Sequence, residues 1–201
     1  MSNWCECRLT PSDRLYHDTQ WGIPQHDDRA LFEALMLEAL QCGLSWSIVY
    51  GKVSVFRRAF AAFDYEKVAR FTDADTERIM QLDGMIRSER KIRAVISNAC
   101  CFIKIREECG SFSEYLWKYT EHRTILYSNH ENGAVPVSNA LSDNIAHDLK
   151  KRGFKFLGTV TVYAFLQAVG VINDHSCSCP RYRYIIKNFS CRKMRDDGEK
   201  F

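Results

Sequence analysis

The sequence contains no long hydrophobic run: none of its apolar stretches approaches the roughly 18 residues that a membrane-spanning helix requires. Its beginning, MSNWCECRLTPSDR, has no apolar stretch after a basic segment, so we predict no secretory signal peptide. Apolar and polar residues alternate over only a few positions, and there is no internal repeat or low-complexity segment. These absences predict a cytoplasmic protein, or a nuclear one in a eukaryote, that has no membrane partner.

A disulfide framework is not predicted either. The nine cysteines are an odd number, and a chain without a secretion signal belongs in a reducing compartment. Cys42, Cys100 and Cys101 lie in apolar helical patterns, where a free thiol acts as a small hydrophobic side chain. Other cysteines lie near the two ends of the chain, in polar, non-periodic sequence: Cys5, Cys7, Cys177 and Cys179.

Composition and charge are those of an ordinary globular protein. Hydrophobic residues make up 46% of the 201 residues and charged residues 26%, which is enough for a sizeable core in one domain. The net charge is only +3, but residues 181–201 carry seven Lys or Arg and three Asp or Glu residues. A basic tail suits an anionic partner such as nucleic acid, although solvated tails are often basic as well.

Helical periodicity dominates the chain. Asp27 or Asp28 can cap a helix through ALFEALMLEALQ that Gly43 ends, and Ser45 can cap a second helix. In residues 46–63, apolar side chains three and four positions apart form one face of that second helix. Further helices are predicted at residues 65–71, 73–82, 88–108, 112–119, 139–151 and 159–168, with residues 120–137 as the main loop. The predicted fold class is all-α.

One carboxylate interrupts the apolar surface of the first of these helices. On a helical wheel Glu38 falls between Leu31, Leu35 and Cys42, so its side chain is predicted to be buried. A buried carboxylate is costly unless it is paired or lines a polar cleft. Glu38 is therefore either a structural acid bonded to a helix end or an arginine, or a ligand-binding group.

Aromatic residues gather around this helix. Tyr16 and Trp21 precede it, and Trp46 follows it in the segment G-L-S-W. An aromatic stripe usually belongs to the core. Because Trp46 opens a helix beside a glycine turn, its ring can reach either the core or a cleft between the two helices.

The segment L-D-G-M-I-R-S-E-R-K-I joins two predicted helices through Gly84. It resembles a helix-hairpin-helix, a module whose hairpin amides and helix N-terminus bind a phosphate of the DNA backbone. Arg87, Arg90 and Lys91 could add positive charge. The common form of the module has a second glycine where Ile86 stands, so an ordinary helix turn is the alternative.

The ends of the chain hold a possible metal site. His17 follows Cys5 by twelve residues, and His175 precedes Cys179 by four. Two cysteines and two histidines form a closed tetrahedral zinc site, which is structural because no coordination position is left open. Surface thiols and unrelated histidines are the alternative, and spacing alone does not say which cysteines bind.

Several motifs together resemble one known family, the 3-methyladenine DNA glycosylase I family. They run in order from about Cys5 to Pro180: Y-H-D-T-Q-W-G-I-P, L-F-E-A-L-M-L-E-A-L-Q-C-G-L-S-W, D-G-M-I-R-S-E-R-K-I, F-S-E-Y-L-W, K-R-G-F-K-F-L-G-T and N-D-H-S-C-S-C-P. The resemblance implies a helix-hairpin-helix glycosylase fold in two helical subdomains, joined at the termini by a structural zinc. It places this glycosylase domain in residues 1–182 and leaves residues 183–201 as a basic tail without a family counterpart.

The resemblance also implies the activity and its residues. The enzyme would be a monomer that flips 3-methyladenine out of alkylated double-stranded DNA, hydrolyses its N-glycosidic bond without cutting the strand, and releases the free base; in a bacterium it would associate with the nucleoid. Glu38 would recognise the base, as the only catalytic candidate. The other residues that the family pattern implies are Tyr16, Trp21 and Trp46 around the base, Leu44, Gly84, Arg87 and Lys91 at the DNA, and Cys5, His17, His175 and Cys179 as zinc ligands.

The chain departs from the family pattern near its start. The family usually spaces its first cysteine and histidine one residue further apart than Cys5 and His17, and Cys7 competes as the ligand. Glu89 stands in the hairpin region where the family often has a neutral or basic residue. Two other classes of protein compete with the glycosylase: a zinc-stabilised DNA-binding module without catalysis, and an enzyme with catalytic zinc.

Overall fold

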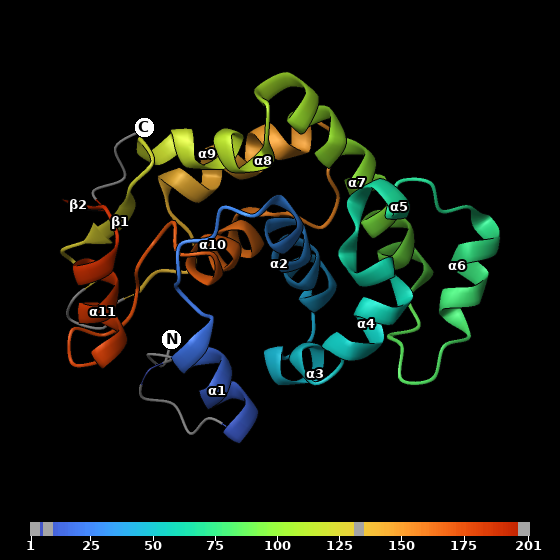
Figure 1. Ribbon diagram of the computed structural model, residues 1–201, viewed down its shortest axis with the longest axis horizontal. Coiled ribbons are helices and arrows are strands. Elements are labelled where there is room, and N and C mark those ends of the chain that lie inside the picture. Colours follow the sequence, from blue (N-terminus) through green and yellow to red (C-terminus); the bar gives the residue numbers. More distant parts are fainter. Residues whose placement is uncertain (1–4, 6–9, 131–134, 197–201) are drawn as a thin grey trace.

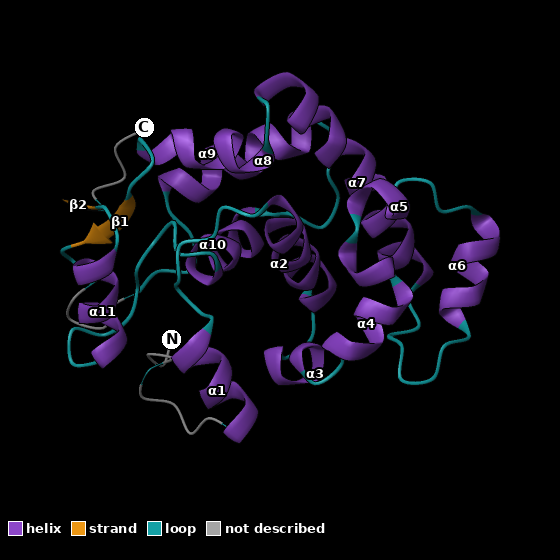
Figure 2. Cartoon of the chain, in the orientation of Figure 1, coloured by secondary structure: helices purple, strands orange, loops and turns teal. Residues whose placement is uncertain are grey.

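The structure is a computed structural model that describes residues 5, 10–130 and 135–196. Over these residues it is mainly helical (Figures 1 and 2), which confirms the predicted predominance of helices. The helices are α1 (Pro11–Thr19), α2 (Asp28–Gln41), α3 (Trp46–Tyr50), α4 (Val53–Ala59), α5 (Tyr65–Val68), α6 (Asp73–Met80), α7 (Glu89–Cys109), α8 (Phe112–Trp117), α9 (Ala140–Lys151), α10 (Thr159–Ala168) and α11 (Pro180–Asn188), with short 3-10 turns η1 (Ala61–Phe63) and η2 (Lys118–Thr120). No helix among the described residues is long and apolar enough to cross a membrane.

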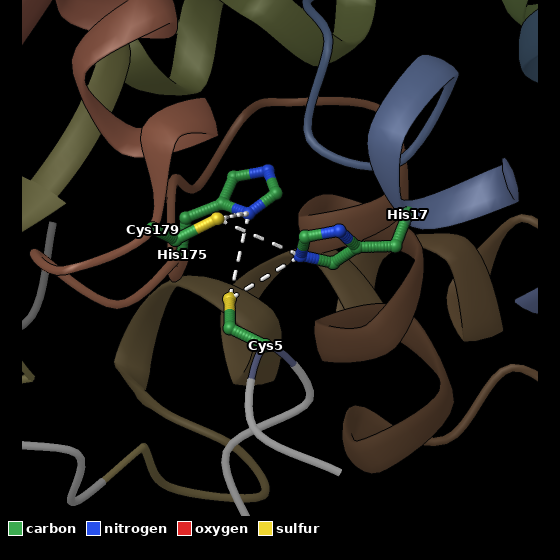
Figure 3. A group of neighbouring side chains, drawn as sticks. All are labelled: Cys5, His17, His175 and Cys179. Carbon is green, nitrogen blue, oxygen red and sulfur yellow. Dashed lines mark hydrogen bonds between the residues drawn. The ribbon is translucent and has the colours of Figure 1, made fainter. Parts of the chain in front are cut away.

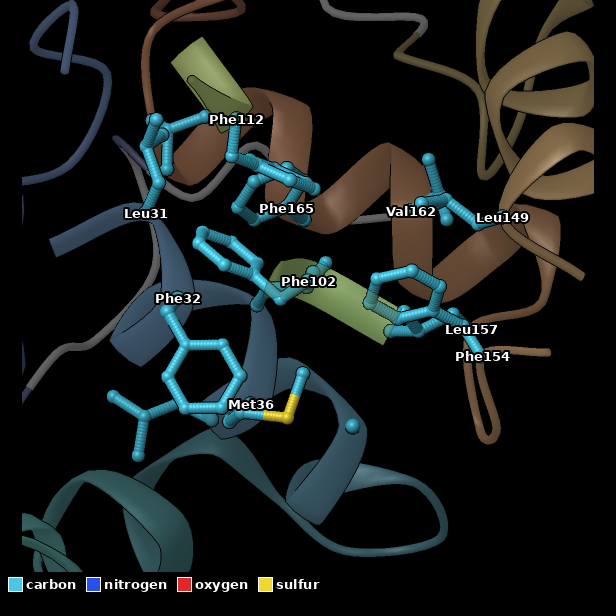
Figure 4. Close-up of a cluster of buried hydrophobic side chains, with 14 of the residues drawn as sticks. Leu31, Phe32, Met36, Phe102, Phe112, Leu149, Phe154, Leu157, Val162 and Phe165 are labelled. Atoms are coloured by element: carbon cyan, nitrogen blue, oxygen red, sulfur yellow. The ribbon is translucent and has the colours of Figure 1, made fainter. Parts of the chain in front are cut away.

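Helix α2 lies in the middle of the fold. Asp27 caps it by accepting a hydrogen bond from the Ala30 amide, as the sequence predicts. Because α2 is apolar almost all round, it is covered on several sides, and it packs against α7, α8 and α10. Figure 4 shows the aromatic centre of this core, where the Phe102 ring lies 4.3 Å from that of Phe112 and 5.1 Å from that of Phe32. Removing such a buried ring typically costs about 3–5 kcal/mol of stability, so this core holds α2 firmly in place.

The helix predicted over residues 46–63 is broken into α3, α4 and η1. The break falls at Gly51, whose amide donates back to the Ser47 carbonyl, and at Lys52, whose amide donates to the Val49 carbonyl. Glycine loses the most conformational freedom in a helix, which makes it a natural place for such a break. The predicted apolar face is nevertheless present, because four of its side chains are fully buried: Val49, Phe56, Phe60 and Phe63.

The expectation of a strand-free loop over residues 120–137 is wrong in one part. Thr124–Tyr127 form strand β1, which pairs in parallel with β2 (Cys191–Met194) and bridges to Ile172 on its other side. All four β1 residues are buried, so the segment shows no alternation that could reveal a strand. Its partner also lies more than sixty residues away along the chain, beyond the reach of local patterns.

The C-terminal segment packs on the body of the protein as far as Asp196. Helix α11 spans the boundary expected at residue 182, and β2 follows it. The backbone amide of Asp196 donates a hydrogen bond to the side-chain oxygen of Asn129 at 2.9 Å. The carboxylate of Asp196 lies 3.2 Å from Nε2 of His130. The described part of the expected basic tail is therefore helix and strand that cover β1.

Candidate active site

A cavity of about 270 Å³ brings the predicted base-binding residues together. Glu38 reaches it from α2, Tyr16 from α1 and Trp46 from the first turn of α3, while Trp21 comes from the segment that links α1 to α2. The opposite wall consists of α10 and residues 135–137. Residues from four separate parts of the chain thus converge on one space.

Glu38 is the charged centre of this cavity. Its side chain is only 6% exposed, and within the described part of the chain its carboxylate accepts no hydrogen bond. Burial raises the pKa of Glu38 to about 8, since desolvation penalises the charged form. Burial therefore favours the neutral, protonated form of this carboxyl. Among the residues that the structure describes, no arginine or helix end pairs with Glu38, so they give no support to its interpretation as a structural acid.

Tyr16 and Trp46 line the cavity, and the ring of Tyr50 packs against both. The rings of Tyr16 and Trp46 have centroids 5.1 Å apart. Tyr50 stacks against Trp46 at 5.9 Å and lies tilted against Tyr16 at 4.9 Å. Burial, followed by the charge of Glu38, raises the pKa of the Tyr16 hydroxyl. Tyr50 was not singled out from the sequence, although it stands one helical turn after Trp46 and so shares its face.

A hydrogen bond holds α1 and α3 together behind these rings. The Ser47 hydroxyl donates to the Asp13 carboxylate at 3.2 Å, and Asp13 is itself part of the N-terminal cap of α1. Ser45 caps α3 by accepting from the Ile48 amide, as predicted. These contacts fix the two helices that carry Tyr16 and Trp46.

The far wall contains polar residues that sequence reasoning missed. Asp174 accepts hydrogen bonds from the Tyr163 hydroxyl at 2.6 Å and the Gln167 amide at 2.9 Å, and its other oxygen lies 2.8 Å from His130 Nδ1. These contacts fully engage the carboxylate of Asp174 and orient the α10 side of the cavity. Gln41 adds a polar side chain from the last position of α2. The sequence does carry a signal for Asp174, since it stands in the N-D-H motif next to the predicted ligand His175.

Beside the cavity, the four predicted metal ligands form a compact cluster (Figure 3). The ligand atoms of Cys5, His17, His175 and Cys179 all lie within 4.8 Å of one another. The four sulfur–nitrogen distances are 3.3, 3.6, 3.8 and 3.9 Å. Zinc bonds of about 2.3 Å to sulfur and 2.0 Å to nitrogen at tetrahedral angles put such atoms about 3.6 Å apart. The cluster therefore has the dimensions of a tetrahedral metal site.

The surroundings orient these ligands as a metal site requires. His17 Nδ1 lies 2.7 Å from the Asp18 carboxylate, and His175 Nε2 lies 3.2 Å from the Trp21 carbonyl, so the opposite ring nitrogens face the cluster. The Ser176 amide donates to the Cys5 sulfur at 3.4 Å. Burial, followed by the nearby His17, lowers the pKa of His175 to about 3, which keeps its ring neutral as a metal ligand must be.

The structure places the competing cysteines differently. Cys179 is in the cluster and buried, whereas Cys177, two residues earlier, is not part of it. Cys7, which was weighed against Cys5, lies outside the described residues. Trp21 connects cluster and cavity, because its ring packs 4.5 Å from that of His175 and 5.7 Å from that of His17.

The predicted DNA-facing residues differ in their environments. Gly84 has φ +78°, a conformation that favours glycine, in the turn between α6 and α7. Arg87 is exposed and Leu44 is half-buried. The Lys91 ammonium is not turned to solvent: it donates to the carbonyls of Leu40 and Cys42, both at 2.6 Å. Lys91 therefore donates hydrogen bonds within the protein, which its predicted role as a DNA contact does not include.

The fold and the cavity are those of a DNA glycosylase. The chain superimposes with a TM-score of 0.83 on 3-methyladenine DNA glycosylase I from Staphylococcus aureus, a structure described as the basis of 3-methyladenine recognition, with 34% identity over 89% of this chain and 95% of that one. A family model described as methyladenine glycosylase matches residues 4–182, and the chain belongs to this family.

Curated relatives agree. The chain is 40% identical over 179 residues to DNA-3-methyladenine glycosylase 1 of Escherichia coli strain K12, which covers 88% of this chain and 96% of the relative. It is also 40% identical over 166 residues to the DNA-3-methyladenine glycosylase of Haemophilus influenzae, covering 82% and 89%. The similarity thus extends over most of each chain rather than one motif.

Proposed function

We propose that the protein removes 3-methyladenine from alkylated double-stranded DNA by hydrolysing the N-glycosidic bond, as an enzyme of base-excision repair. The family membership and the names of the relatives support this activity. The observation that carries it is the buried Glu38 carboxyl, which has no protein partner in the described chain and shares a cavity with Tyr16 and Trp46. A cationic, planar base supplies what this cavity lacks.

The physical chemistry of the cavity selects for a cation. Methylation at N3 gives the adenine a positive charge in DNA, and a cation in the cavity stabilises the ionised form of Glu38. The carboxylate then accepts a hydrogen bond from the exocyclic amine of the base. An unmodified adenine offers no charge to offset the cost of ionising a buried carboxyl, so selectivity for the damaged base follows.

Stacking compensates for flipping the base. Taking a base out of the duplex costs a few kcal/mol, and less when the base is damaged. Stacking on an aromatic side chain contributes about 1–3 kcal/mol per base. A cation over the Trp46 ring adds on the order of 0.5–2 kcal/mol. These contributions are of the same size as the cost.

The positive charge also activates the bond that breaks. Electrons of the glycosidic bond pass to the cationic ring, which leaves as neutral 3-methyladenine. Water bonds to the sugar carbon and loses a proton to the solvent, which leaves a hydroxyl group on the sugar. No lysine nucleophile is needed for this hydrolysis, so the enzyme is monofunctional and leaves the strand intact. Glu38 in this scheme binds and discriminates, and it is the candidate catalytic residue only through that contact with the base.

We further infer that Cys5, His17, His175 and Cys179 hold a structural zinc ion. The fit rests on the four sulfur–nitrogen distances and on the oriented histidines. With four protein ligands the ion has no open position for water or substrate, which argues against catalytic zinc. Bound there, the ion would tie the N-terminal segment to the segment before α11 and thereby connect two helical subdomains.

DNA would meet the face that carries the turn at Gly84 and the segment after α2. The amides of that turn and the N-terminus of α7 suit a backbone phosphate, with exposed Arg87 beside them. Leu44 would insert where the base leaves the stack. The protein acts as a monomer in this proposal, because a single chain contains the whole cavity.

A base-release assay tests the proposed function. Duplex DNA carrying 3-methyladenine is incubated with the protein, and the released base and the strand are analysed separately. Free 3-methyladenine with an uncut abasic strand is the expected result. DNA binding without any released base would instead support the DNA-binding module without catalysis.

A further inference from the structure

We propose that Lys91 and Lys52 are positioning residues, which hold the DNA-binding hairpin against the segment that carries Gln41, Leu44 and Trp46. The part of the protein that binds the DNA backbone is then fixed relative to the part that receives the flipped base. This proposal rests on the proposed function. It assigns the two ammonium groups to backbone carbonyls of the protein, rather than to phosphates of DNA.

Lys91 connects the start of α7 to the end of α2. Its ammonium donates to the carbonyls of Leu40 and Cys42, both at 2.6 Å. The last carbonyls of a helix have no partner within the helix, and the helix dipole makes this end negative. A lysine ammonium satisfies both needs, so Lys91 acts as a side-chain cap for α2.

The capped turn is the one that faces the flipped base. Gln41, which lines the cavity, lies between the two carbonyls that Lys91 binds. The Leu44 amide then donates to the Gln41 carbonyl at 2.7 Å, which continues the same turn. Lys91 thereby fixes Gln41 and Leu44 relative to Glu38, one helical turn earlier.

Lys52 makes a second connection from the opposite direction. It lies between α3 and α4, and its ammonium donates to the carbonyl of Gly84 in the hairpin at 2.6 Å. The short α3 that precedes Lys52 starts with Trp46. Hairpin and cavity are therefore linked twice, once through α2 and once through α3.

Both ammonium groups are already engaged by backbone carbonyls. No ion pair of Lys52 or Lys91 with an acidic side chain is found in the part of the chain that the structure describes. The carbonyl contacts hold each ammonium in place. Partial burial lowers the pKa of Lys91. Arg87, by contrast, is exposed on the same hairpin.

The expected effect is a loss of excision without a loss of base recognition. A shift of about 1 Å in a reacting group can cost on the order of 100-fold in rate. Lys91→Met and Lys52→Met should each slow single-turnover release of 3-methyladenine from duplex DNA at least about tenfold. The affinity for free 3-methyladenine, measured by tryptophan fluorescence, should stay within about twofold of wild type, because the cavity walls remain.

Salt dependence separates positioning from phosphate contact. A lysine that binds a phosphate contributes about one unit to the slope of log affinity against log salt. Lys91→Met should leave this slope unchanged, whereas Arg87→Met should lower it. Lys91→Arg, which keeps charge and donors, should recover part of the excision rate. Lys104→Met, on the exposed side of α7, is the matched control with wild-type behaviour.

Each outcome decides the matter. A smaller salt slope in Lys91→Met means a phosphate contact and overturns the proposal, as does an excision rate equal to wild type. If a lysine variant loses affinity for free 3-methyladenine as well as excision rate, and its melting temperature falls, the lysine only stabilises the fold, which overturns the proposal. If wild type releases no 3-methyladenine, the proposed function fails and this inference with it; if wild type is active, only the positioning role is being judged.

Discussion

The rings of Tyr16 and Trp46 touch each other in the cavity, with centroids 5.1 Å and planes 39° apart. A base held between two parallel rings needs about 7 Å between them, since each stacking contact takes about 3.5 Å. The base therefore either stacks on one ring only or separates the pair. Tyr16, Trp46 and Glu38 also line a second cavity of about 550 Å³, which offers the rings space to move. The two aromatic side chains thus line both cavities.

Because Trp46 offers an aromatic face in the cavity, it should contribute strongly to the affinity for the base. Trp46→Leu should raise the Kd for free 3-methyladenine about tenfold or more, within the roughly 1–3 kcal/mol assigned to one stacked base. Trp46→Phe keeps an aromatic face and should lose much less. Isothermal calorimetry on both variants checks this, and equal affinities for the Leu variant and wild type would show that Trp46 does not touch the base.

The pKa of Glu38 predicts the pH dependence of excision. In the free enzyme burial raises that pKa to about 8, so below pH 8 the carboxyl carries a proton that must leave before a cationic base is bound optimally. kcat/KM for alkylated DNA should accordingly rise from pH 6 to about 8 and then level off, since this ratio reports the free enzyme. Glu38→Gln should abolish the rise and weaken binding of free 3-methyladenine. A wild-type profile that is flat from pH 6 to 9 contradicts the assignment.

The two neighbouring cysteines of the N-D-H-S-C-S-C-P segment should differ sharply. Cys179→Ser should lower the zinc content and the melting temperature, because Cys179 lies in the cluster. Cys177→Ser should change neither, and it serves as the matched control two residues away. Elemental analysis of the purified proteins with thermal unfolding provides the measurement. Loss of zinc from Cys177→Ser with retention in Cys179→Ser would reverse the ligand assignment.

Substitutions at two glycines with positive φ should distinguish the energetic cost of backbone strain from the cost of a steric clash. At Gly170 (φ +73°) an added Cβ would come 2.4 Å from the backbone nitrogen of Pro24, whereas at Gly110 (φ +86°) nothing lies within 4 Å. Gly110→Ala should cost only the left-handed conformation, about 1–2 kcal/mol. Gly170→Ala should cost that and a further ~1–3 kcal/mol for overpacking. Chemical denaturation measures the free energy of unfolding of both variants. Equal losses of that free energy would mean that the backbone at Pro24 moves away from the added Cβ at no energetic cost.

Much of the helical layout and most candidate residues followed from the sequence. Caps such as Asp27 and Ser45, and apolar periodicity as in α7, are local features that neighbouring residues decide. The base-binding residues and Cys179 were identified through a resemblance to a family, whose motifs keep their order along this chain. The four predicted ligands, Cys179 among them, can form their cluster once the two ends of the chain lie close together in the fold.

Tertiary structure alone decided the features that depend on distant partners. Strand β1 exists because Cys191–Met194 lies beside it, and its four buried residues carry no period of their own. Lys91 is predicted as a DNA contact because charge in a hairpin suits phosphate, and only the structure shows that its ammonium donates to the carbonyls of Leu40 and Cys42. Likewise, Glu38 was predicted to be buried, yet only the fold shows that the space around it is a cavity without a protein partner among the described residues. Local sequence determines which elements form, whereas what a polar side chain faces depends on packing between segments far apart in the chain.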